Sequence, residues 1–165
     1  MKYKNKINFE DYLLSIQFTK DVINSNLDKF YMRRQTNKFK IFSDILLGKV
    51  CEFVVSYELD GCSEPDLRIY PSKKKSFDAD LVAKGFNIHV KSCLESSSFE
   101  TSWLFQPEDD LTINPSSKDL LALCVINDNY EVKFDIVKAK DMVGKYKDPL
   151  KKELNKKVIY YKDFL

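Results

Sequence analysis

Four side chains that could act on a phosphate group occur close together in the middle of the chain: Asp78, Asp80, His89 and Lys91. Side chains alternate between the two faces of a strand, so the two aspartates share one face of a first strand. By the same rule, the histidine and the lysine share one face of a second strand. A turn at Lys84-Gly85 predicts that the two strands form a hairpin. The hairpin would bring carboxylate, imidazole and ammonium groups together.

This set of groups suits the hydrolysis of a phosphodiester bond. The reaction uses a divalent cation to activate water and to neutralise the charge that builds up on the phosphate. Magnesium prefers carboxylate oxygens, a carbonyl and waters, so Asp80 is the expected main ligand and the Val90 carbonyl completes the shell. Lys91 would orient the attacking water or stabilise the transition state. An ordinary salt bridge between Asp80 and Lys91 is the alternative, and it stays open.

Helices are expected before these strands and further strands after them. Apolar spacing predicts helices in residues 1–40 and from Phe39 to Leu59, and a short one near Ala139–Tyr146. Strands are predicted, in chain order, at Asp66–Tyr70, Phe77–Ala83, Phe86–Ser92, Thr101–Gln106, Leu120–Asn127, Tyr130–Val137 and Val158–Tyr161. The order predicts one α/β domain. It would have a helical N-terminal arm (1–40), a catalytic core (41–137) and a basic C-terminal segment (138–165).

The pattern of Asp80, eight intervening residues and then His89-Val90-Lys91 resembles the signature of the PD-(D/E)xK nuclease superfamily, the restriction-endonuclease-like enzymes. Those nucleases commonly carry a glutamate on the helix before the sheet, and Glu52 matches it. Gly48 lies one helical turn before Glu52, and its small size would let the glutamate reach the site by close packing. A later strand often presents a glutamine, which Gln106 matches.

The resemblance implies a restriction-endonuclease-like core, with a central mixed β-sheet flanked by helices. It implies a DNA endonuclease that depends on Mg²⁺, with Mn²⁺ as a substitute. The implied catalytic residues are Asp80, Glu52, His89 and Lys91, and the implied metal ligands are Asp80, Glu52, His89 and the Val90 carbonyl. Contacts to DNA are expected from Lys73, Lys74, Lys75, Ser92 and Gln106. One site per chain must cut two strands, so a homodimer is expected.

His89 departs from the pattern, because it stands where the superfamily has an acidic residue. Imidazole is a neutral and softer ligand, so magnesium binding should weaken unless Glu52 compensates. Asp66 follows Pro65 as a literal Pro-Asp pair, but it is far from Lys91 in sequence, and Asp80 is the preferred ligand. A nucleic-acid-binding module with little or no activity and a protein-interaction domain stay open. Thiol catalysis by Cys93 with His89 has less support.

Amino-acid composition and charge distribution limit the classes of protein and binding site that remain possible. The 165 residues are 44% hydrophobic, enough for one sizeable core. Four cysteines without a CxxC pair and a single histidine disfavour the common zinc motifs, and free thiols in a reducing cytoplasm are expected. The longest apolar run, Leu120–Ile126, is too short to cross a membrane. Residues 1–40 and 138–165 each hold 9 basic and 4 acidic residues, against 9 and 17 in residues 41–137. Basic ends suit a polyanion, and an acidic middle suits a metal ion.

Overall fold

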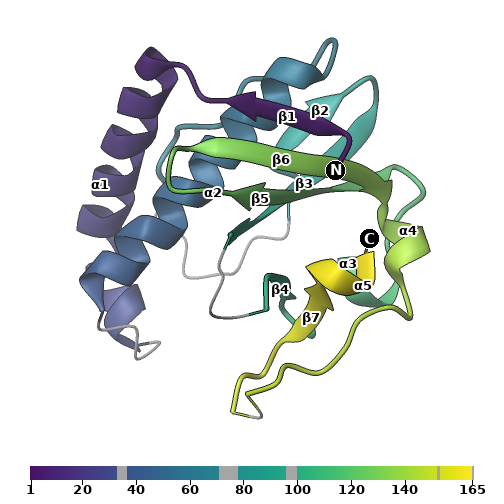
Figure 1. Cartoon of the computed structure of the whole chain (residues 1–165). Helices are drawn as coiled ribbons and strands as arrows, with labels where there is room; N and C mark the ends of the chain where they lie inside the picture. Colours follow the sequence, from purple (N-terminus) through teal and green to yellow (C-terminus); the bar gives the residue numbers. More distant parts are fainter. Residues whose placement is uncertain (33–36, 71–77, 96–99, 152, 165) are drawn as a thin grey trace.

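The computed structural model describes residues 1–32, 37–70, 78–95, 100–151 and 153–164. The strands are β1 (Tyr3–Lys6), β2 (Leu81–Ala83), β3 (Phe86–Leu94), β4 (Ser102–Phe105), β5 (Asp119–Ile126), β6 (Glu131–Lys138) and β7 (Lys157–Tyr160). The helices are α1 (Phe9–Met32), α2 (Lys38–Glu58), α3 (Asp110–Ile113), α4 (Ala139–Met142) and α5 (Tyr161–Phe164). Within these residues, β1-β6-β5-β3-β2 form a five-stranded mixed sheet, and β4 and β7 a two-stranded one (Figure 1). A mixed α/β fold with a central mixed sheet and helices is therefore confirmed.

The predicted hairpin is present as β2 and β3. Its two-residue loop places Lys84 at φ 50° and Gly85 at φ 79°. Positive φ at both positions matches the twist that a two-residue hairpin loop requires, and glycine adopts it at little cost. The register pairs Leu81 with Ile88 and Ala83 with Phe86. β2 begins at Leu81, so it is shorter than the predicted strand Phe77–Ala83. Residues 78–80 are not in the strand, and Phe77 lies outside the described residues.

Strand β5 is buried on both faces, as its apolar sequence predicts. It runs parallel to β3 and antiparallel to β6. Ala122, Cys124 and Ile126 face a first hydrophobic core, which α2 covers with Val50, Cys51, Phe53, Val54 and Val55. Leu121, Leu123 and Val125 face a second core on the other side of the sheet. The strand is thus the wall between two packed layers.

The second core is built by the small sheet and the short helices. Trp103 and Phe105 of β4 are fully buried there, beside Leu111 of α3 and Met142 of α4. The indole Nε1–H of Trp103 donates to the carbonyl of Cys124 at 2.8 Å and so ties β4 to the main sheet. β4 pairs with β7 rather than with the central sheet, a partnership that its own sequence does not encode.

Three sequence predictions need correction. Residues 66–70 are not a strand, because the Asp66 carboxylate accepts hydrogen bonds from its own neighbours, and such local bonds compete with a strand ladder. The helix predicted near Ala139–Tyr146 ends at Met142, and Gly144 then has φ 85°. The N-terminal region is not helical throughout, because β1 pairs with β6 at the edge of the main sheet. Among the described residues, no helix is long and apolar enough to cross a membrane.

Candidate active site

Asp80 lies at the point where pairing between β2 and β3 ends. Its N–H donates to the Ile88 carbonyl at 3.0 Å, and its carboxylate Oδ2 accepts from the Val90 N–H at 2.7 Å. The side chain therefore takes over a hydrogen bond that a longer β2 would have made through its backbone. This contact fixes the Asp80 carboxylate against β3, beside the residue that precedes Lys91.

The charge of Asp80 is opposed by burial and supported by its neighbours. Burial raises the pKa of Asp80, while the Val90 N–H and then the charge of Lys91 act to lower it. His89 and Lys49 lower it further, but the balance remains upward. Both residues of the proposed structural salt bridge are described, and no ion pair joins Asp80 to Lys91 within 4.0 Å. The structure thus brings Asp80 under the influence of Lys91 without locking the two together.

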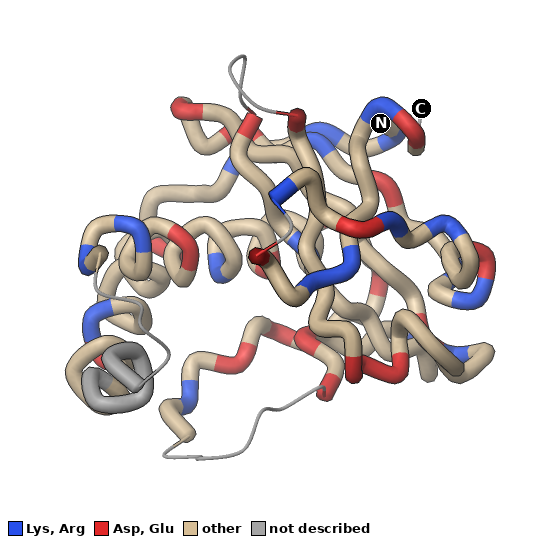
Figure 2. Tube along the Cα trace, turned by 90° about the horizontal axis from the view of Figure 1, so that it is seen from below, with Lys and Arg blue, Asp and Glu red and all other residues tan. Residues whose placement is uncertain are grey.

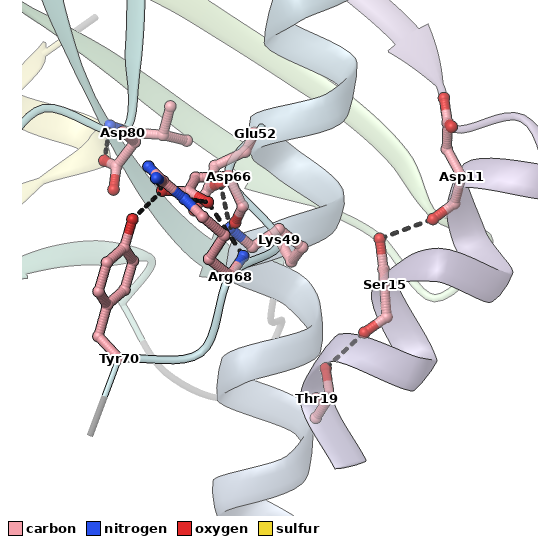
Figure 3. A network of polar contacts seen from close by, with 10 residues as sticks. Asp11, Ser15, Thr19, Lys49, Glu52, Asp66, Arg68, Tyr70 and Asp80 are labelled. Atoms are coloured by element: carbon pink, nitrogen blue, oxygen red, sulfur yellow. Dashed lines mark hydrogen bonds and ion pairs between the residues drawn. The ribbon is translucent and has the colours of Figure 1, made fainter. Parts of the chain in front are cut away.

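Glu52 reaches the same region from α2. Burial raises the pKa of Glu52 to about 7, Lys49 lowers it, and the charge of Asp80 raises it again. The Lys49 Nζ lies 2.5 Å from Glu52 Oε2, and the two side chains are only 8% and 14% exposed. Figure 3 shows Glu52, Lys49 and Asp80 gathered between α2 and the hairpin. The prediction that the helix contributes a carboxylate near Asp80 therefore agrees with the placement.

The glycine before Glu52 has a weaker role than its position suggests. A Cβ atom at Gly48 would meet only the Ser92 hydroxyl, at 3.9 Å. That is an ordinary van der Waals distance, so an alanine would fit. Packing at this contact therefore does not require glycine itself, and the expected link between small-residue packing here and the reach of Glu52 stays a prediction. Ser92 itself faces α2 at this contact.

A second set of polar residues adjoins Glu52, and sequence reasoning did not identify it as part of the site. Lys49 Nζ also donates to the Asp66 carbonyl at 2.8 Å. The Asp66 carboxylate accepts from Arg68 Nε and Nη2, both at 2.9 Å, and from the Tyr70 hydroxyl at 2.6 Å. The Arg68 guanidinium and then the Tyr70 hydroxyl hold the pKa of Asp66 well below its usual range. Helical spacing alone could have flagged Lys49, since it is three residues before Glu52.

His89 and Lys91 lie on the opposite face of β3 from α2. In the register, His89 pairs with Leu121 and Lys91 with Leu123, which both face the second core. His89 is 7% exposed, and its Nε2 lies 3.3 Å from the Oδ1 atom of Asp119. Lys91 Nζ lies 5.3 Å from the centre of the Phe105 ring. The predicted common face is real, but β4 and β5 flank it with partners that the hairpin sequence does not reveal.

Asp119 is the main partner of His89. Burial acts to raise the pKa of Asp119, but the Ser116 N–H and the His89 ring outweigh it, so the pKa is lowered. Asp119 begins β5, thirty residues after the histidine, and nothing in its local sequence identifies it. The imidazole is therefore held by a carboxylate on its own side of the sheet.

The remaining predicted residues occupy varied positions. Val90 packs against the first core, which leaves its backbone groups for contact with Asp80 and the neighbouring strands. Gln106 follows β4 and is partly buried. Lys73, Lys74 and Lys75 lie outside the described residues. The structure therefore places Asp80 at the end of the hairpin, with Glu52 on the α2 face of β3. Lys91 and His89 lie on the opposite face, and the proposed DNA contacts stay predictions.

The donors fit a hard cation in kind. Glu52 and Asp80 supply carboxylate oxygens, which Mg²⁺ prefers. Burial is the main cause of the raised pKa of both carboxyls, so a positive charge beside them would favour their ionised forms. Within the described part of the chain, no group of three or more His, Cys, Asp or Glu side chains is arranged to hold a metal ion. A cation here would thus rest on two carboxylates supplemented by backbone oxygen and water.

Comparison of the chain with protein-family models, with curated proteins and with solved structures gives no match in any of the three.

Proposed function

We propose that the protein is a metal-dependent DNA endonuclease on a restriction-endonuclease-like core. The observation that carries the proposal is the placement of two part-buried carboxylates: Glu52 of α2 and Asp80, which is held by the Val90 N–H of the strand that bears Lys91 (Figure 3). Carboxylates that repel each other in a low-dielectric site are costly for a purely structural purpose. They are suited to binding a divalent cation.

Each residue has a role in this proposal. Asp80 and Glu52 would hold Mg²⁺ or Mn²⁺, with the Val90 carbonyl as a further oxygen donor. The bound ion would activate water and neutralise charge on the phosphate. Lys91 would attract the phosphate and stabilise its transition state, since its ammonium already acts on Asp80. His89, held by Asp119, would hydrogen-bond near the site rather than replace a carboxylate.

DNA as the substrate and a homodimer as the active form belong to the same proposal. The fold intersperses the charges that the sequence separates: over the described trace, Figure 2 shows basic and acidic residues side by side. Lys4 pairs with Glu131 at 3.3 Å, and Lys147 with Asp163 at 2.5 Å. Attraction of DNA would therefore depend on local groups such as Arg68, whose side chain is 77% exposed beside the candidate site.

The direct test uses plasmid, linear and branched DNA with Mg²⁺ or Mn²⁺. Asp80→Asn and Lys91→Met should each abolish cleavage in a protein that melts normally. Asp44→Asn is the matched control, because Asp44 is an exposed carboxylate of α2 that pairs with Lys40. Wild-type rates in both site variants would refute the assignment.

A nucleic-acid-binding module without catalysis is the second candidate. It is favoured by the existing partners of two site residues, since Lys49 neutralises Glu52 and Asp119 holds His89. Such a module would retain DNA in the presence of a chelator and lose it steeply with salt. It would cut none of the DNA forms with either metal ion.

A further inference from the structure

Lys49 is a buried cation that the proposed reaction does not use. Its ammonium is held by three contacts from three parts of the chain. It lies 2.5 Å from Glu52 on its own helix, donates to the Asp66 carbonyl at 2.8 Å, and sits 4.3 Å from the centre of the Phe18 ring on α1. A buried ammonium is costly unless it is paired, so this arrangement maintains a positive charge at the carboxylates.

The helix that supplies Phe18 packs closely at this point. Ser15 and Thr19 of α1 are fully buried and small, and each hydroxyl donates to a carbonyl one turn earlier, at 2.8 Å to Asp11 and 2.7 Å to Ser15 (Figure 3). Internally satisfied hydroxyls let α1 lie close to α2 without unpaired polar groups. The Phe18 ring is thereby kept beside the Lys49 ammonium.

The charges around the site balance without a metal ion. When both carboxyls are ionised, Glu52 and Asp80 contribute two negative charges, and Lys49 and Lys91 two positive ones. A divalent ion at the carboxylates would therefore add two uncompensated positive charges and would compete with Lys49 for Glu52. A DNA phosphate would offset part of that excess.

We propose that Lys49 is the resident counter-ion of the Glu52–Asp80 site, which a divalent cation must displace from Glu52, and that this competition couples metal binding to DNA binding. The inference rests on the proposed function, because it takes those two carboxylates as the metal site. After displacement, Lys49 stays anchored by the Asp66 carbonyl and the Phe18 ring. Its charge weakens metal binding in the free protein and less so when a phosphate is present.

The test measures Mn²⁺ binding to the full chain by the loss of the free-ion signal in electron paramagnetic resonance, at pH 8.5 so that protons compete little. Lys49→Met should tighten binding at least about tenfold. That is the effect of one unit charge on a divalent ion at ~6 Å, even at the dielectric constant of water. A non-cleavable DNA duplex should increase the Mn²⁺ affinity of both proteins. The increase should be larger for wild type than for Lys49→Met.

Two controls isolate the charge of Lys49. Lys40→Met removes a lysine from the same helix that pairs with Asp44 at 2.6 Å, and it should leave Mn²⁺ affinity within twofold. Lys49→Arg keeps the charge and should also keep the weak binding. If the Lys49 variants do not fold, the side-chain ¹⁵Nζ resonance of Lys49 in the wild-type protein provides the readout, and it should shift on addition of Mg²⁺.

Unchanged or weaker Mn²⁺ binding by folded Lys49→Met overturns the inference, as does a Lys49 resonance that Mg²⁺ does not move. Absence of Mn²⁺ binding by both wild type and Lys49→Met overturns it too. Cleavage measured on the same samples separates the two proposals. Metal-dependent cleavage without an effect of Lys49 on affinity removes only the inference, whereas tighter binding without any cleavage removes only the nuclease activity.

Discussion

The two faces of strand β3 solve the problem of buried charge differently. On the α2 face, Glu52 is neutralised by Lys49 from one turn away on the same helix. On the opposite face, His89 meets Asp119 from a strand thirty residues later. The first pairing is local and the second depends on the finished sheet. Asp80, at the end of the hairpin, interacts with charged groups on both faces. Lys49 on the α2 face and Lys91 and His89 on the other face all lower its pKa.

The two faces of β3 therefore need not contribute equally to the proposed cleavage reaction. The α2 face holds a carboxylate whose pKa is raised to about 7, mainly because it is buried. The other face holds His89, which is already stabilised by its contact with Asp119. We therefore expect the largest functional effects at Asp80 and Lys91, smaller ones at Glu52, and the smallest at His89.

The largest effect should come from Asp80→Asn. The amide keeps an oxygen that can accept the Val90 N–H, so the fold should persist, while a charged metal ligand is lost. Cleavage should fall at least about a thousandfold, which corresponds to roughly 4 kcal/mol of transition-state stabilisation. Single-turnover cleavage beside a melting curve measures both. A loss below tenfold in a well-folded variant would show that Asp80 is not the main metal ligand.

Glu52 should make stability depend on pH. A carboxyl whose pKa rises from 4.5 in the unfolded chain to about 7 in the fold binds its proton more tightly in the fold. The stability it contributes is complete below pH 4.5 and is lost as the pH rises to 7, in total about 3 kcal/mol. Urea unfolding at pH 5 and pH 8 should show this decline in wild type, without metal ions.

Glu52→Gln is the matched comparison for that decline. The amide cannot ionise, so the difference between the two pH values should shrink by about 3 kcal/mol. An equal pH dependence in both proteins would show that another group causes it.

On the opposite face, His89→Gln should have a smaller effect. Glutamine can still donate to Asp119, and the imidazole is already engaged there. Cleavage should fall by about tenfold, or roughly 1.4 kcal/mol. A loss as large as that of Asp80→Asn would make the two faces equal partners and would end the contrast drawn between them.

Gly48→Ala should give the smallest effect, and in the stabilising direction. The Cβ has room beside Ser92, and alanine is favoured over glycine inside a helix by about 0.5–1 kcal/mol. Chemical denaturation should show this gain with cleavage unchanged. Destabilisation would reveal a packing demand between α2 and β3 that the 3.9 Å separation does not suggest.

The sequence predicted what is locally encoded. The Lys84-Gly85 turn and the alternation around His89 gave the hairpin, and helical spacing gave α2 within one residue at each end. These features depend on residues a few positions apart, where turn chemistry and side-chain periodicity act directly.

The sequence could not predict contacts made by distant partners. Asp119 meets His89 only because β5 lies parallel to β3, and Phe105 approaches Lys91 only because β4 leaves the main sheet to pair with β7. Residues 66–70 had the composition of a strand, yet Arg68 and Tyr70 satisfy Asp66 locally. Tertiary pairing decided the contacts of His89 and Lys91, and local side-chain hydrogen bonds decided the conformation of residues 66–70.

Strand β1 has a consequence for how the chain acquires its fold. Tyr3 of β1 pairs with Phe134 of β6, and their ring centres lie 4.9 Å apart. β1 therefore cannot join the sheet before β6 is present. Contacts of such long sequence separation close late and slow folding. During synthesis, helices α1 and α2 can form early, but the sheet edge stays open until β6 has left the ribosome. A nascent chain would therefore complete its native five-stranded sheet only after β6 has been made.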